Sequence, residues 1–233
     1  MVDLSSEMAE LWASLGASVS GRGRVVQITA ARRGEGVSTV ARELALFAAR
    51  RAGRSVWLVD LDLIAAPQHA AIVDGAARYG ALSEPAQASP DGSMFFTIQP
   101  QAQTAAGEVR PDAQYLAAHR VGAARWWVTR FQRERLAAGQ GVHVLAAGNY
   151  WDSLRRVVDL VIVDGPSPER SRAGLTVSPF MDQTVLVVAA DQPDVGAPAR
   201  MRDAVTAAGG NVAGLFFNRG GVEPPGFLSP ARP

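Results

Sequence analysis

The stretch that organises this sequence is "RVVQITAARRGEGVSTVARELALFAAR", residues 24–50. Its first seven residues form a short run rich in β-branched side chains, which is typical of a strand. A glycine-containing loop follows directly, and Val40, Leu44 and Phe47 then recur at helical spacing. The stretch therefore predicts a strand, a tight loop and a helix in immediate succession.

The loop nearly matches the pattern G-x-x-x-x-G-K-[ST], in which backbone N–H groups and the positive end of a helix hold phosphate. Gly36, Ser38 and Thr39 fit this pattern, and Gly34 adds a further glycine. Val37 stands where the pattern requires lysine, and an alanine replaces the first glycine. Taken alone, the loop is read equally well as a glycine turn in which Ser38 or Thr39 caps the helix.

The composition is that of a globular protein without a strong overall charge. Of 233 residues, 48% are hydrophobic and 19% are charged, and the net charge of +1 gives no field that would attract nucleic acid. Cysteine is absent, which excludes disulfides and thiolate metal sites. All 23 basic residues are arginine, so no lysine elsewhere in the chain can replace the missing one. Because neither a secretion signal nor a membrane-spanning run is recognisable, we expect a cytoplasmic protein.

Further apolar runs alternate with helical stretches, and this alternation favours βαβ units. We expect strands at residues 55–62, 142–148, 159–166, 182–191 and 212–219, and helices near 150–158 and 197–208. Continuous apolar strands of this kind are covered on both faces. The sequence therefore predicts one α/β domain over residues 1–233, with a doubly wound, mostly parallel sheet flanked by helices on both faces.

Three segments do not follow the alternation. Residues 1–21 predict an N-terminal helix whose apolar stripe packs either on the sheet or on another protein. Residues 84–140 form an atypical insert in which arginines interleave with tryptophan and phenylalanine; without a wider basic field, this mixture favours a buried or partner-facing segment over nucleic-acid binding. Residues 221–233 are expected to be a flexible tail.

Carboxylates stand at the ends of two predicted strands. Asp60 and Asp62 are two residues apart, which places both on one face of a regular strand, and Asp164 ends another strand. The carboxyl ends of parallel strands gather where an open α/β sheet binds its ligand. A magnesium ion there would take oxygen ligands, among them a hydroxyl such as that of Ser38.

Five segments, taken in order, resemble the bacterial tyrosine kinases of capsule and exopolysaccharide synthesis. These segments are "ITAARRGEGVSTVARELA", "VWLVDLDL", "DLVIVDGPSP", "QTVLVVAADQ" and "VAGLFFNR". The family belongs to the deviant Walker P-loop ATPases, together with the chromosome-partitioning and Min-type proteins. The resemblance covers most of the chain except residues 84–140 and the tail. It implies a P-loop NTPase-like fold, Mg-ATP or Mg-ADP as cofactor, and homo-oligomers.

The resemblance also implies roles for individual residues. The nucleotide-binding residues that it implies are Arg32, Gly34, Glu35, Gly36, Val37, Ser38, Thr39, Asn218 and Arg219. The implied magnesium ligands are Ser38, Asp60, Asp62 and Asp164, and Asp60 is also the candidate catalytic base. Within the wider group, Asn218 and Arg219 correspond to the adenine contact, and Arg32 corresponds to a second lysine that reaches across a dimer.

Several departures from the family pattern occur together. Val37 removes the cation that stabilises charge on the transferred phosphoryl group, a contribution of several kcal/mol. The three tyrosines, Tyr79, Tyr115 and Tyr150, lie outside the tail, where the family carries its autophosphorylation sites. The N-terminal segment "EMAELWASL" lacks the arginines that the family uses in ring assembly, and Ile64 replaces an arginine after the paired aspartates.

These departures favour a catalytically impaired family member, a pseudo-kinase or pseudo-ATPase. We expect it to regulate polysaccharide synthesis or export through the cytoplasmic part of a membrane chain-length regulator or another export component, which would also bring it to the membrane. We expect nucleotide to bind weakly or not at all, because the carboxylates without lysine leave a negative site. Two alternatives stay open: an active ATPase or tyrosine autokinase that uses Arg32 or Arg33 in place of the lysine, and a Min-type partitioning or positioning ATPase.

Overall fold

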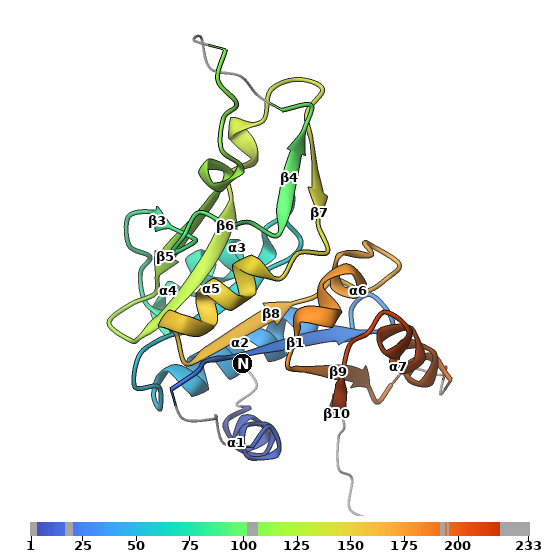
Figure 1. The fold of residues 1–233 in the computed structure, drawn as a ribbon. Coiled ribbons are helices and arrows are strands. Elements are labelled where there is room, and N and C mark those ends of the chain that lie inside the picture. The colour runs from blue at the N-terminus through green and yellow to red at the C-terminus, as the bar shows by residue number, and fades with distance from the viewer. Residues whose placement is uncertain (1–3, 17–20, 102–106, 192–193, 195, 220–233) are drawn as a thin grey trace, which may run out of the picture.

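The computed structural model describes residues 4–16, 21–101, 107–191, 194 and 196–219. It confirms the predicted architecture, because a mostly parallel sheet carries helices on both faces (Figure 1). The predicted tail at residues 221–233 lies outside the described residues, as do residues 1–3 and 17–20 of the N-terminal segment. No described helix combines the length and the apolar character that crossing a membrane requires.

The main sheet has the strand order β10-β9-β1-β8-β2-β6-β5-β3. Its strands are β1 (Arg24–Ala30), β2 (Val56–Asp60), β3 (Ala86–Gln87), β5 (Leu116–Arg120), β6 (Trp126–Phe131), β8 (Leu160–Asp164), β9 (Gln183–Ala189) and β10 (Val212–Asn218). From β10 to β6 all neighbours are parallel, and β5 and β3 then add two antiparallel pairings. The chain leaves β1 for β2 and later inserts β8 between them, so the carboxyl ends of these three strands lie side by side.

The described residues form seven α-helices: α1 (Ser5–Ser14), α2 (Val37–Ala49), α3 (Pro67–Asp74), α4 (Ala76–Tyr79), α5 (Asn149–Val157), α6 (Ala173–Val177) and α7 (Ala197–Ala207). Alternate residues of the central strands face opposite layers, as the period of a strand requires. Val26 and Ile28 pack in the layer of α1, α2 and α3, whereas Val25 packs in the layer of α5 and α6. The helix α7 packs against β9 and β10.

The predicted N-terminal helix packs inside the molecule. Met8, Leu11 and Leu15 are buried, and the ring of Trp12 lies 6.5 Å from that of Phe47 on α2. The apolar stripe of α1 is therefore covered by α2 rather than by the sheet itself.

Residues 84–140 contribute four strands that their weak periodicity did not reveal. Among them β6 pairs in parallel with β2, and Trp126 is fully buried beneath the ring of Tyr79, 6.1 Å away. The arginine-flanked aromatic segment is thus largely core, since Phe131 is also buried.

The predicted strand at 142–148 was wrong in its length and its place. The strand β7 (Gly141–Val144) pairs antiparallel with β4 (Phe96–Gln99), and these two form a separate sheet that rises beside β6 (Figure 1). The reason is visible in its alternation, because the exposed His143 separates the half-buried Val142 and Val144. Such a pattern is typical of a half-exposed strand, not of a central one.

We predict that Trp126→Ala lowers the free energy of unfolding by about 3–5 kcal/mol, because it removes a fully buried indole and leaves a cavity. Its neighbour Trp127 is only half-buried, stacked on Trp57 at 5.9 Å, so Trp127→Ala is the matched control with a smaller expected loss. Urea denaturation measures both. A wild-type stability for Trp126→Ala would show that this segment is not part of the cooperative core.

Candidate functional site

A pocket of about 240 Å³ opens where β1, β2 and β8 end. It is lined by loop residues 32–39, by carboxylates at the ends of β2 and β8, and by the segment that follows β8. The sheet register produces this arrangement, because Asp60 pairs directly with Asp164 and Asp164 with Ile28. The structure thus gathers the loop and the carboxylates, which the sequence predicted separately, at one edge.

The loop has the backbone conformation of an anion-binding turn. Gly34 and Gly36 have φ values of +86° and +95°, a left-handed conformation that favours glycine. The N-terminus of the 13-residue helix α2 follows at once. Within the described residues, the backbone N–H groups of residues 34–38 have no hydrogen-bond acceptor. Successive free N–H groups at a helix N-terminus form a concave site that suits phosphate.

Val37 is half-buried at the first position of α2. Its side chain packs against the apolar core between α2 and the sheet. The position that normally carries the phosphate-binding cation therefore adds apolar packing and no charge.

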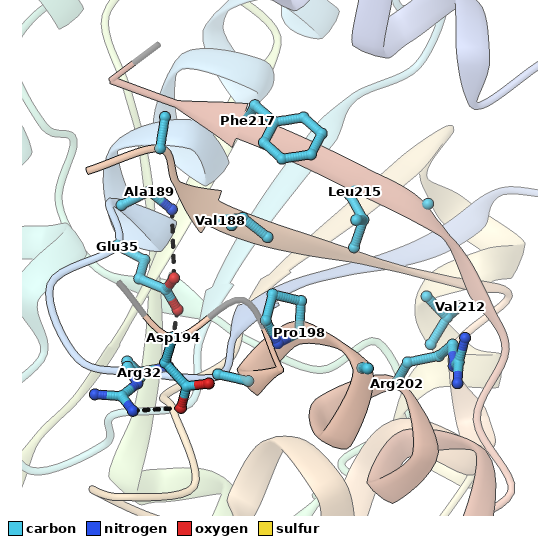
Figure 2. A pocket seen from close by; sticks show the side chains of 14 residues that line it. Arg32, Glu35, Val188, Ala189, Asp194, Pro198, Arg202, Val212, Leu215 and Phe217 are labelled. Carbon is cyan, nitrogen blue, oxygen red and sulfur yellow. Dashed lines mark hydrogen bonds and ion pairs between the residues drawn. The ribbon is translucent and has the colours of Figure 1, made fainter. Parts of the chain in front are cut away.

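Glu35 and Arg32 hold the loop in place rather than pointing freely into the pocket. The Glu35 carboxylate is almost fully buried and accepts the N–H groups of Arg32, at 2.8 Å, and of Ala189, at 3.3 Å. Figure 2 shows these bonds from a neighbouring pocket, which residues of β9, β10 and α7 line. The Arg32 guanidinium forms an ion pair with Asp194 at 2.6 Å (Figure 2). In this structure Arg32, which the sequence resemblance assigns to a cross-dimer contact, is engaged within its own chain.

The residues after β10 reach the same loop. The Asn218 amide donates to the backbone oxygen of Glu35 at 2.8 Å, and the Arg219 guanidinium donates to that of Gly34 at 2.9 Å. A Cβ atom on Gly36 would meet the Asn218 amide at 2.1 Å, so the second loop glycine is also required by close packing.

Two buried carboxylates lie side by side. Asp60 accepts the backbone N–H groups of Asp62, at 2.9 Å, and of Gln68, at 3.0 Å. Burial raises the pKa of Asp60 well above its usual range, and the charge of Asp164 raises it further. Burial also raises the pKa of Asp164, against the opposing hydrogen bonds from Ser38 and Gln68. The pair is therefore costly to ionise without a cation.

The same-face argument for Asp60 and Asp62 was wrong, although both residues line the pocket. The strand β2 ends at Asp60, and Asp62 reaches the pocket from the following turn. The Asp60 carboxylate itself turns the chain by accepting the Asp62 N–H group, as aspartate side chains often do in turns.

Sequence reasoning missed Gln68. This side chain is fully buried at the start of α3, and its amide nitrogen donates to Asp164 at 2.6 Å and to the backbone oxygen of Ser38 at 2.8 Å. Its amide oxygen accepts from Arg42 at 2.9 Å. A lone glutamine after "IAAP" carries no motif, so only the fold reveals that it links the loop helix to the carboxylates.

Sequence reasoning also missed Arg170, which follows β8 in "DGPSPER". Its guanidinium forms an ion pair with the Asp62 carboxylate at 2.5 Å, and the residue lines the pocket. The strand pattern ends at Asp164, and nothing in the sequence indicates that the chain folds back over the loop.

The donor set suits magnesium only as part of a complex with phosphate. Among the described residues, no three His, Cys, Asp or Glu side chains are grouped so that they could hold a metal ion. Mg²⁺ is commonly held by one or two carboxylates together with substrate phosphates and waters. The Ser38 hydroxyl and Asp164, which both line the pocket, fit that role.

The sequence matches no family model and no curated protein. Solved structures do resemble it. The kinase domain of the Escherichia coli tyrosine kinase ETK is 16% identical, with 98% of this chain and 80% of that chain covered and a TM-score of 0.59. The VpsO kinase domain is 20% identical, with 94% and 96% covered and a TM-score of 0.54.

A third similar structure is cobyrinic acid a,c-diamide synthase from Mycobacterium smegmatis, with bound ADP and magnesium. It is 14% identical, with 84% of this chain and 74% of that chain covered and a TM-score of 0.51. At such identities the comparisons establish the fold. The fold is that of the P-loop NTPases, and its structural neighbours include bacterial tyrosine kinase domains, as the resemblance in the sequence predicted.

Proposed function

We propose that this chain is a catalytically impaired relative of the bacterial polysaccharide tyrosine kinases, which binds magnesium nucleotide weakly and acts through a protein partner. One observation carries the proposal. The loop keeps its free N–H groups and its buried carboxylates, while Val37 packs into the core where the cation is needed.

Binding is supported by groups that do not depend on the lysine. The unpaired N–H groups of residues 34–38 and the end of α2 favour an anion. Ser38 and Asp164, which both line the pocket, would hold a magnesium ion that accompanies the phosphate. A bound cation would also compensate the charge of the two buried carboxylates.

Impaired turnover is supported by the engagement of the arginines near the loop. Arg32 pairs with Asp194, so it does not stand as a free point charge beside the phosphates. Arginine is bulkier than lysine and rarely replaces it at such a position. The missing preorganised cation is worth several kcal/mol in the transition state, or about 100- to 1,000-fold in rate.

The tyrosines do not fit an autophosphorylating role. Tyr115 and Tyr150 are buried, and the Tyr79 hydroxyl donates to Glu43 at 2.7 Å. None of the three tyrosines of the sequence is therefore freely presented to a kinase site. We propose that the partner is the cytoplasmic part of a membrane chain-length regulator or another export component, and that this partner supplies any membrane association.

We predict that calorimetry will show weak, magnesium-dependent binding of ADP and ATP, and that Val37→Lys will tighten it about tenfold or more, because a charged donor is restored to the loop. Val157→Lys, on the exposed side of α5, is the control for an added lysine. ATP hydrolysis is measured on the same samples. If wild type hydrolyses ATP and Val37→Lys does not hydrolyse it faster, the proposed impairment is refuted.

We predict a pH-dependent gain in stability for Asp164→Asn. The unfolded chain has an ordinary aspartate pKa of about 3.9, whereas burial raises the pKa of Asp164 in the folded chain. The folded state thus holds its proton to higher pH, so the wild-type free energy of unfolding falls as pH rises above about 4. The Tm of Asp164→Asn should therefore increase relative to wild type between about pH 4 and 7.

Thermal unfolding in the absence of nucleotide, at several pH values, measures this difference. The exposed Asp203→Asn serves as the control. A Tm difference that does not change with pH would contradict the buried charge as its cause.

A further inference from the structure

The segment after β8 folds back across the mouth of the loop pocket. Glu169 accepts the backbone N–H group of Arg33 at 2.9 Å, and the next residue, Arg170, pairs with Asp62 at 2.5 Å. A turn closed by the N–H group of Arg170 on the Ser167 oxygen, at 2.9 Å, directs the chain back. The two contacts place Arg170 at the pocket, with its guanidinium beside Asp62.

Arg170 differs from the other arginines that line this pocket. Arg32 is held by Asp194, which does not line it, and Arg33 has an exposed side chain. The partner of Arg170 is Asp62, which is itself a pocket residue. Its charge therefore faces the cluster formed by the carboxylates of the pocket.

We propose that Arg170 is the phosphate-binding cation of this site. When a nucleoside diphosphate or triphosphate enters the loop, the guanidinium exchanges the Asp62 carboxylate for the β-phosphate. This inference rests on the proposed nucleotide function and names the residue that gives the site its affinity for a polyphosphate.

The chemistry of the exchange is favourable. A guanidinium binds carboxylate and phosphate with the same forked, bidentate geometry, so one anion can replace the other without a change in the donor. The Arg170 side chain is 41% exposed and that of Asp62 is 17% exposed, so solvent screens the pair in part. The incoming phosphate replaces Asp62 at the guanidinium, and the freed carboxylate remains beside the magnesium donors.

The arrangement also accounts for the absence of lysine from the loop. Val37 provides no charge, and the nest of N–H groups alone does not offset four pocket carboxylates, Glu35, Asp60, Asp62 and Asp164. Arg170, in the segment after β8, adds a positive charge that offsets part of this negative charge.

The test is isothermal titration of the full chain with ADP and with AMP, each with magnesium and with a chelator. Wild type should bind ADP more tightly than AMP, since only ADP carries the β-phosphate. Arg170→Ala should lose about tenfold or more in ADP affinity in both conditions and should bind ADP no better than AMP. Arg170→Lys should keep part of the preference. Arg172→Ala, an exposed arginine two residues along the same segment, should match wild type.

Three results would overturn the proposal. ADP affinity unchanged in Arg170→Ala would reject this inference alone and leave the proposed nucleotide function standing. The second result is a loss of ADP affinity in Arg170→Ala that occurs only with magnesium and disappears when wild type and Arg170→Ala are compared in an Asp62→Asn background. It would mean that Arg170 only holds Asp62 in place. If the wild-type chain binds no ADP, the nucleotide function and the inference fall together. The Tm of Arg170→Ala must equal that of wild type, which confirms that the variant is folded.

Discussion

The parallel pairing of β1 with β8 and of β8 with β2 is the constraint from which the rest of the site follows. It sets Asp164 between Ile28 and Asp60 at one edge of the sheet, directly below the loop that leaves β1. Two carboxylates that are 104 residues apart in the chain, at positions 60 and 164, are thereby buried against each other. An arrangement this costly requires compensating contacts, and the surrounding structure supplies them.

Gln68 is the centre of that compensation. Its side chain and backbone donate to both carboxylates, and it also holds the start of α2 through the Ser38 oxygen. The helix that presents the loop and the strands that present the carboxylates are therefore mechanically linked. Buried charge of this kind is a cost in stability that proteins accept at functional sites.

The same network explains how the loop can persist without its lysine. Glu35 fastens the loop to the end of β9, Asn218 and Arg219 fasten it to the end of β10, and Val37 fastens it to the core. The shape of the loop thus depends on packing and backbone contacts and not on the missing cation. The loop therefore keeps its shape without a charge at position 37, and Arg32 and Arg170, which line the pocket, stand in ion pairs with Asp194 and Asp62.

The sequence by itself determined the strand, loop and helix of residues 24–50, the later apolar strands and the carboxylates at two strand ends. Local signals suffice for these, because the strand, loop and helix of residues 24–50 are contiguous and the carboxylates stand at apolar strand ends. It did not determine the place of β7, the strands within residues 84–140, or the end of β2 at Asp60. Those depend on pairing between distant segments and on a side-chain hydrogen bond, neither of which has a periodic signature.

Only the tertiary structure decided the partners of the charged residues. Arg32 with Asp194, Arg170 with Asp62, and Gln68 with Asp164 are all contacts between separate segments, and a lone arginine or glutamine has no local pattern. The sequence could therefore show that a phosphate-loop cation was missing, because the position is defined by its neighbours in the chain. The path of the chain after β8 decides that Arg170 lies at the pocket. Only the folded molecule shows this path.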